Sequence, residues 1–101
     1  MYYSANILFK SEGSDTEEPL WEERILLVAA LDELEAEEKA RNYAIKNEVE
    51  YKVTGNASVV WKFYQIERVY LIDDELEDGA ELFSRFLRNS EVESLLTPFD
   101  D

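Results

Sequence analysis

The sequence predicts an α+β fold, a four-stranded antiparallel sheet with the long helix packed on one face. Two segments of alternating polar and apolar residues precede a segment with helical spacing, and two more alternating segments follow it. A chain of 101 residues has the length of one domain, and 46% hydrophobic residues can form its core. We therefore expect a single domain 1–101 in the order ββαββα(α), with a core over about residues 1–88 and a helical tail over 89–101.

The first two segments are predicted strands. Residues 2–10 alternate as in a strand with one buried face. A polar loop then ends at Pro19, and the segment 21–29 becomes apolar on both faces from Ile25 to Val28. A strand covered on both sides would explain that change, so we expect this strand to lie at the centre of the sheet.

Residues 31–47 have the spacing of an amphipathic helix. Asp32 and Glu35 fit an N-cap and capping box, and the early acidic residues favour a helix N-terminus. The apolar stripe is narrow, which lets a helix lie close against a sheet, and it consists of Ala36, Ala40, Tyr43 and Ala44.

The second half predicts two more strands, over residues 49–53 and 58–72, with a hairpin turn at 54–57. Because fifteen residues is long for one strand, we expect a bulge or bend near 65–67. Four apolar residues then predict a one-sided helix: Leu82, Phe83, Phe86 and Leu87. Ser90 with Glu93 suggests a second capping box, and the terminal helix should share the face of the long helix or cover a sheet edge.

Charge is the most distinctive compositional feature. The net charge is −14, which would repel nucleic-acid phosphates and anionic membranes, so we expect neither as a partner. Seventeen of the 24 acidic residues fall in three runs, at 12–23, 32–38 and 73–81. Such concentration favours fast association with a basic protein, although a solvated surface alone would also account for it.

The chain contains neither histidine nor cysteine, which removes most common catalytic groups and any zinc site built on nitrogen or sulfur. We therefore expect no enzyme activity and no cofactor; a carboxylate pair or a carboxylate-bound divalent cation is the remaining alternative. The absence of cysteine permits a reducing compartment, and the N-terminal segment lacks the pattern of a signal peptide. A cytoplasmic location is the resulting expectation.

The stretch 73–87, DDELEDGAELFSRFL, raises the question of a calcium loop. With Gly79 as the sixth position of an EF-hand, Leu76 and Arg85 would occupy two ligand positions that require oxygen donors. A weak divalent site among Asp73, Asp74 and Asp78 stays open. The plainer interpretation is a strand end, a turn at Gly79 and acidic residues that favour the start of the next helix.

The two tryptophans have different expected environments. Trp61 lies in an apolar strand and is expected in the core, whereas Trp21 follows an acidic loop and could anchor an interface. Arg85 is expected to pair with an acidic residue of the preceding turn. The candidate partner-binding residues are therefore Trp21, Glu22, Glu23, Asp73, Asp74, Glu75, Glu77, Asp78 and Arg85.

Several segments resemble a known bacterial family. They are YYSANILFKSEG, PLWEERILLVAA, an Ala- and Glu-rich helix, VVWKFYQI and ELEDGAELFSRFL, and together they reach Leu87 and exclude the tail. On these segments the chain resembles the family catalogued as domain of unknown function 4288. The resemblance implies a small standalone protein without an assigned activity, and it supplies no catalytic residues.

Three functional hypotheses follow. The first is a non-enzymatic protein-interaction domain whose acidic face meets a basic protein, in its concrete form an immunity-type inhibitor of a basic toxin. The second is a carboxylate-based divalent-metal protein. The third is a purely structural domain, monomeric or a homodimer formed by pairing an exposed strand edge.

Overall fold

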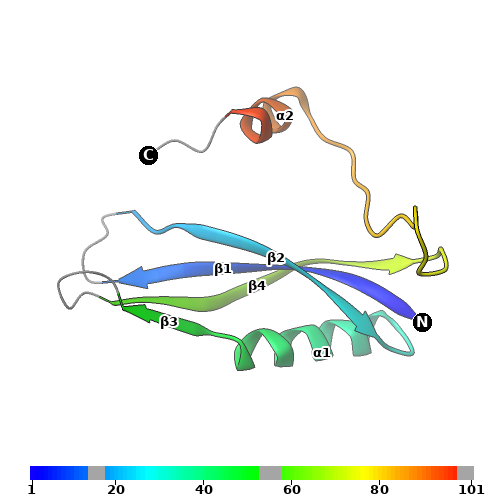
Figure 1. Cartoon of the computed structure of the whole chain (residues 1–101), viewed down its shortest axis with the longest axis horizontal. Coiled ribbons are helices and arrows are strands. Elements are labelled where there is room, and N and C mark those ends of the chain that lie inside the picture. The colour runs from blue at the N-terminus through cyan, green and yellow to red at the C-terminus, as the bar shows by residue number, and fades with distance from the viewer. Residues whose placement is uncertain (14–17, 53–57, 98–101) are drawn as a thin grey trace.

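The computed structural model describes residues 1–13, 18–52 and 58–97, which form an antiparallel sheet with a helix on one face (Figure 1). The α+β class is confirmed. The elements are β1 (Tyr2–Gly13), β2 (Trp21–Ala29), α1 (Glu33–Lys46), β3 (Val49–Lys52), β4 (Ser58–Ile72) and α2 (Asn89–Leu96). The hairpin turn predicted at 54–57 lies outside the described residues.

The strand order in the sheet is β2-β1-β4-β3, and every neighbouring pair is antiparallel. β2 is therefore an edge strand, and the expectation that it lies at the centre is wrong. β1 takes β4 as its second neighbour, which leaves the outer side of β2 unpaired. The apolar run in β2 has another reason: Leu26 and Val28 pack toward α1, whereas Ile25 and Leu27 lie on the opposite side and are 53% and 54% exposed.

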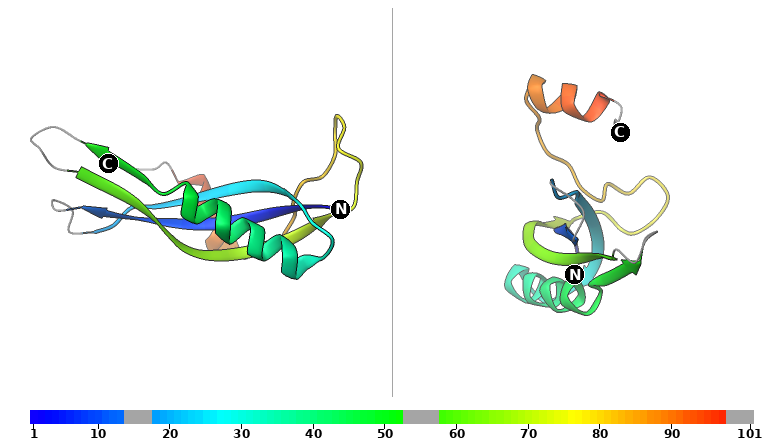
Figure 2. Two further views of the ribbon diagram at one scale, coloured as in Figure 1. Left: turned by 90° about the horizontal axis from the view of Figure 1, so that it is seen from below. Right: turned by 90° about the vertical axis from the view of Figure 1, so that its left-hand side faces the viewer.

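β4 contains two irregularities in its pairing with β1. The register shifts between Asn6 and Ile7 and again between Leu8 and Phe9, so that Glu67 and Tyr64 are the additional residues on β4. The shift at Glu67 confirms the predicted bulge. Because bulges bend a strand and increase its twist, they allow this 15-residue strand to curve with the sheet (Figure 2).

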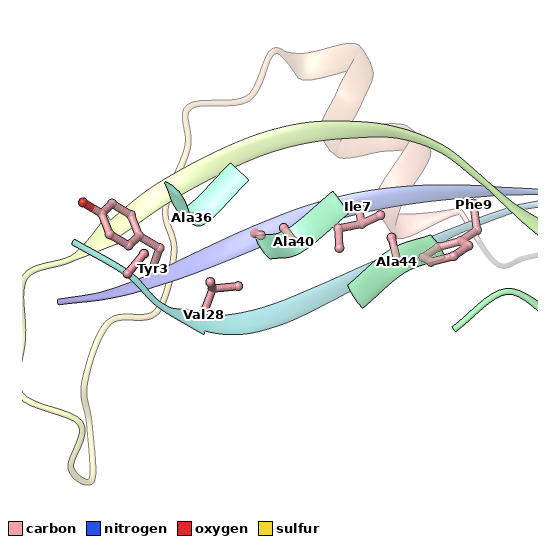
Figure 3. Close-up of a cluster of buried hydrophobic side chains, with 9 residues drawn as sticks. Tyr3, Ile7, Phe9, Val28, Ala36, Ala40 and Ala44 are labelled. Carbon is pink, nitrogen blue, oxygen red and sulfur yellow. The ribbon is translucent and has the colours of Figure 1, made fainter. Parts of the chain in front are cut away.

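The core lies between α1 and the side of the sheet that faces it (Figure 3). Alternate residues of β1 provide its centre, and all of them are buried: Tyr3, Ala5, Ile7 and Phe9. The helix contributes Ala36, Ala40 and Ala44, each at most 1% exposed. Their spacing of four residues places three small side chains on one face, so that the helix backbone approaches the sheet closely.

Local interactions fix both ends of α1. Asp32 Oδ1 accepts a hydrogen bond of 2.8 Å from the backbone N–H of Glu35, which confirms the predicted N-cap. The Glu35 carboxylate instead lies 3.8 Å from Lys39 Nζ, one turn along the helix. At the C-terminus the Asn47 N–H donates to the carbonyl groups of Tyr43 and Ala44.

The predicted helix over residues 82–87 is wrong, because residues 80–88 have no regular secondary structure. Phe83 packs edge to face on Tyr70 at a ring-centroid distance of 5.4 Å, whereas Phe86 is fully exposed. Phe83 thus packs on Tyr70 and does not form part of a helical apolar stripe, as its spacing had indicated. An extended segment satisfies this contact and leads the chain away from the sheet.

α2 begins at Asn89, earlier than the predicted cap at Ser90 and Glu93. The Glu91 carboxylate accepts a hydrogen bond of 3.0 Å from the Arg88 N–H and supplies the N-terminal cap. The helix lies on the side of the sheet opposite α1 (Figure 2) and buries none of its residues. The expectation that the terminal helix shares the face of α1 or covers a sheet edge is therefore wrong.

Candidate functional site

Two acidic runs that are distant in sequence lie at the same end of the sheet. Tyr2 pairs with both Ala29 and Ile72, so the chain leaves β2 toward α1 and leaves β4 toward the acidic turn at the same end (Figure 1). Since adjacent strands are about 4.8 Å apart, the two exits are separated by about 10 Å. We call this region the acidic end; its members are Asp32, Glu33, Glu35, Glu37, Glu38, Asp73, Asp74, Glu75, Glu77, Asp78 and Glu81.

The acidic turn has a defined internal structure. Asp74 Oδ2 accepts a hydrogen bond of 3.0 Å from the Glu81 N–H, and the Ala80 N–H donates to the Glu77 carbonyl at 3.0 Å. Gly79 has a φ of 90°, a conformation that side chains disfavour. The predicted turn at Gly79 is confirmed, but no helix follows it. Asp74 therefore stabilises the turn, whereas its acidic neighbours present exposed side chains.

The geometry of the described residues offers little support for a metal centre. Among them, no group of three or more acidic side chains is arranged to hold an ion. The hollow beside the turn is open to solvent and is lined by residues of the turn itself, including Glu77, Asp78 and Gly79. One hydrogen bond to the Asp74 carboxylate and one backbone hydrogen bond stabilise this turn.

Trp21 lies at the opposite end of the sheet, half exposed. It contacts Tyr64 edge to face at a centroid distance of 4.8 Å, and Lys10 Nζ lies 5.4 Å from the centre of its ring. Trp21 pairs with Lys10 and Ala29 with Tyr2, so about 27 Å of strand separates Trp21 from the acidic end. The candidate residues thus do not form one continuous site.

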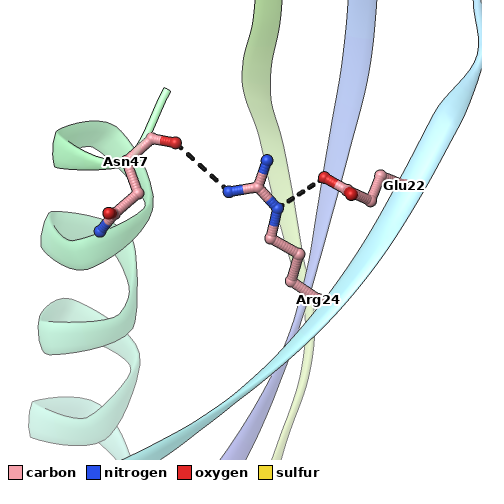
Figure 4. A network of polar contacts seen from close by, with 3 residues as sticks. All are labelled: Glu22, Arg24 and Asn47. Atoms are coloured by element: carbon pink, nitrogen blue, oxygen red, sulfur yellow. Dashed lines mark hydrogen bonds and ion pairs between the residues drawn. The ribbon is translucent and has the colours of Figure 1, made fainter. Parts of the chain in front are cut away.

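Glu22 and Glu23 have structural contacts on different sides of β2. Glu22 Oε1 accepts a hydrogen bond of 2.6 Å from Arg24 Nε, and Arg24 also donates to the Asn47 carbonyl at 3.3 Å (Figure 4). The Arg24 guanidinium lies 3.9 Å from the ring centre of Phe9, so it connects β2, the core and the end of α1. Glu23 accepts a hydrogen bond of 3.3 Å from Asn6 Nδ2 on the other side.

Arg85 is exposed in the irregular segment before α2. It forms no ion pair with any residue that the structure describes, so the predicted pairing with an acidic residue of the turn is wrong. Tyr70 makes the contacts to this segment instead: its hydroxyl donates to Glu81 Oε1 and shares a hydrogen bond with Ser84 Oγ, both at 3.3 Å. These bonds hold the chain up to Ser84 against the sheet.

Sequence reasoning missed a third surface, the side of the sheet turned away from α1. We call it the far face; it includes Ser4, Asn6, Lys10, Ile25, Leu27, Lys62, Tyr64, Arg68 and Tyr70. A small apolar hollow on it is lined by side chains that include Ile25, Leu27 and Leu82. The apolar run of β2 was the available signal, and it was interpreted as burial on both sides of the strand.

Within the described residues, neither helix is long and apolar enough to cross a membrane.

Comparison with family models supplies one match, over residues 2–84. The match covers the sheet, α1 and the acidic turn, and it ends before Arg85 and α2. Comparisons with curated proteins and with solved structures found no match. The resemblance inferred from the sequence is confirmed: the chain belongs to the family described as Domain of unknown function (DUF4288).

Proposed function

We propose that this protein is a non-enzymatic interaction domain that binds a basic protein through its acidic end. The observation that carries the proposal is the convergence of runs 32–38 and 73–81 at one end of the sheet. These runs are far apart in the sequence, and only the fold brings them together. The most concrete form is an immunity-type inhibitor that covers the basic surface of a toxin in the bacterial cytoplasm.

The acidic turn provides the strongest part of this surface. On α1, Lys39 and Arg41 offset Glu35 and Glu37 at distances of 3.8 and 3.0 Å. In the described part of the chain, no such ion pair includes an acidic residue of the turn 73–78. Exposed carboxylates without a cationic partner make the local electrostatic potential more negative. This potential accelerates encounter with a positively charged surface and disfavours negatively charged partners.

The residue types support binding over catalysis. The chain offers no histidine or cysteine as a base or nucleophile, and the acidic residues of the turn 73–81 are exposed. No observation in the described residues favours the alternative of a divalent-metal protein.

The test begins with capture of partners by the tagged full-length chain from host lysate, at low and then moderate salt. A captured basic protein is purified and titrated against Glu75→Lys/Glu77→Lys, which reverses two exposed turn side chains. The matched control is Glu12→Lys/Glu18→Lys, which changes the net charge equally at the opposite end of the sheet. We expect roughly tenfold weaker binding for the turn variant and at most about twofold for the control.

Equal weakening by both variants would mean that net charge alone drives the association and would contradict a specific role for the acidic end. Unchanged binding by both would reject the electrostatic mechanism. An empty capture at both salt concentrations would reject the basic partner. Higher salt should release the partner, since screening shortens the range of exposed charges.

A further inference from the structure

The two edges of the sheet differ in length and in protection. β3, at one edge, has four residues, whereas β2, at the other, has nine and pairs with β1 without a bulge. Natural sheets keep an edge from pairing with another chain by making it short, or by placing proline, lysine or a bulge on it. β3 is short, but β2 contains neither proline nor lysine. The long, regular edge of β2 (Figure 1) is therefore suited to accept another strand.

The backbone groups of β2 alternate between β1 and the outer side. The Ala30 N–H donates to the Met1 carbonyl at 2.9 Å. Because ladder bonds alternate along an antiparallel pair, the even-numbered residues of β2 bond to β1, and the odd-numbered residues direct their N–H and C=O groups outward. The Ala29 carbonyl agrees with this, since Lys39 Nζ reaches it from α1 at 2.6 Å. Within the described chain, no hydrogen bond engages the outward backbone groups of Glu23, Ile25 and Leu27.

The residues along this edge match a second copy of the same strand. Ile25 is the central residue of β2 and has outward backbone groups, so a two-fold axis at Ile25 pairs all nine residues of both copies. In this register Glu23 lies opposite Leu27 of the second copy, and no acidic residue lies opposite another. An axis at Glu23 would pair only residues 21–25 and would oppose two glutamates, which destabilises a strand pair. An axis at Leu27 would pair only residues 25–29.

The antiparallel arrangement also separates the strongest charges. Two chains of net charge −14 repel each other, so a dimer must keep their acidic ends apart. The acidic end follows Ala29, and this register places Ala29 of one copy opposite Trp21 of the other. The two acidic ends therefore lie at opposite ends of the shared strand pair. Trp21, which is 48% exposed and far from its own acidic end, gains a small neighbour on which its ring can pack.

We propose that two copies of this chain pair antiparallel through β2 and form one continuous sheet across a two-fold axis at Ile25. The outward groups of Glu23, Ile25 and Leu27 supply about six backbone hydrogen bonds between the copies. Ile25 and Leu27 of both copies form the apolar centre of the pair, and Trp21 contacts the second copy at each end. The dimer leaves the acidic turn free, so it goes beyond the proposed function and can fail independently of it.

Light scattering on the full-length chain tests the association. We expect a mass twice the 11.8 kDa of the monomer at about 100 µM, and the monomer mass below about 1 µM, because one strand makes a small interface. Higher salt should favour the dimer, since it screens the repulsion between two acidic chains, whereas it should weaken binding to a basic partner. A monomer at every concentration would overturn the proposal, and the edge would then be open to a strand of a different protein. A mass above that of the dimer would contradict the closed two-fold pairing.

Ile25→Pro tests the backbone bonds. The Ile25 N–H points outward, so proline removes a donor from the dimer and none from the pairing with β1. We expect a monomer with an unchanged circular dichroism spectrum. Ile25→Lys is the second variant, in case proline perturbs the strand; it opposes two like charges at the axis and should also give a monomer. The control Leu34→Lys, at an exposed position on α1, changes the net charge equally and should leave the dimer unchanged. A dimer of Ile25→Lys, or a monomer of Leu34→Lys, would contradict the proposal.

Cross-linking tests the register, since the chain has no natural cysteine. Ile25→Cys places two cysteines opposite each other at the axis, with Cα atoms about 5.5 Å apart, and should give disulfide-linked dimers upon mild oxidation. Leu27→Cys is the matched control on the same face, because its two cysteines would lie about 14 Å apart and should not link above the background. A mixture of the Glu23→Cys and Leu27→Cys chains should link. Equal linking of the two single variants Ile25→Cys and Leu27→Cys would overturn the proposed pairing.

Discussion

The two sides of the sheet differ although the same strands build them. On the side facing α1, Ile7 and Phe9 are buried against the alanines of the helix. On the far face, Ile25 and Leu27 have comparable hydrophobicity and remain more than half exposed. The difference shows that an apolar residue on a strand can be buried, but that its side chain is not necessarily buried. Which side is covered depends on where the rest of the chain packs.

The following comparisons use variants of the full-length chain. Each compares free energies of unfolding obtained from urea denaturation.

The largest difference is expected for Phe9→Ala against Phe86→Ala. Phe9 is 1% exposed and contacts both Phe63 and Arg24, so its truncation leaves a cavity in the core. We expect a loss of about 3–5 kcal/mol. Phe86→Ala removes the same ring from an exposed position and should produce no measurable change. Similar losses for both would mean that the segment around Phe86 is packed in solution.

Ala40→Leu tests the close approach of α1. Ala40 is fully buried, and a larger side chain would push the helix away from the sheet. We expect destabilisation by about 1–3 kcal/mol. The exposed neighbour Asn42→Leu introduces the same side chain into the same helix and should change stability by less than about 0.5 kcal/mol. A tolerated Ala40→Leu would contradict the tight helix–sheet contact.

Asp32→Ala tests the capping of α1 and should cost about 1 kcal/mol, because the Glu35 N–H loses its acceptor. Asp32→Asn retains an acceptor oxygen and should recover most of the loss. If the Asn variant is as unstable as the Ala variant, the negative charge near the helix N-terminus, rather than the hydrogen bond, is the stabilising contribution.

The smallest effect is expected on the far face. Ile25→Ser/Leu27→Ser replaces two half-exposed side chains and should change stability by no more than about 1 kcal/mol. Val28→Ser on the covered side of β2 is the matched comparison and should cost more alone than the pair together. The reverse order would show that the far face is covered within a single chain.

Features with local causes could be predicted from the sequence. The capping of α1 by Asp32, the turn at Gly79 and the bulge near Glu67 each depend on a few neighbouring residues. The α+β class and the family membership also followed from patterns in the sequence. The acidic run of the turn is also visible in the sequence, because it depends only on residue types.

Other features could not be predicted because they depend on which segments meet. Leu82 and Phe83 have helical spacing with Phe86, yet the contact between Phe83 and Tyr70 holds this segment extended. Glu22 belongs to an acidic run, but Arg24 engages it at the end of α1. The candidate residues around Trp21 and those around Asp74 lie at opposite ends of the sheet, because the pairing of β1 with β2 and β4 places them there.

The sequence by itself determined the periodicity, the caps and the turn, together with a large negative charge, because these depend on residue types and short spacings. Only the tertiary structure decided that β2 lies at an edge, that two distant acidic runs share one end, and that α2 buries none of its residues. The physical reason is that strand pairing and helix docking depend on contacts between residues that are far apart in the sequence. They are set by the total apolar area buried when all segments pack together, which no single segment encodes.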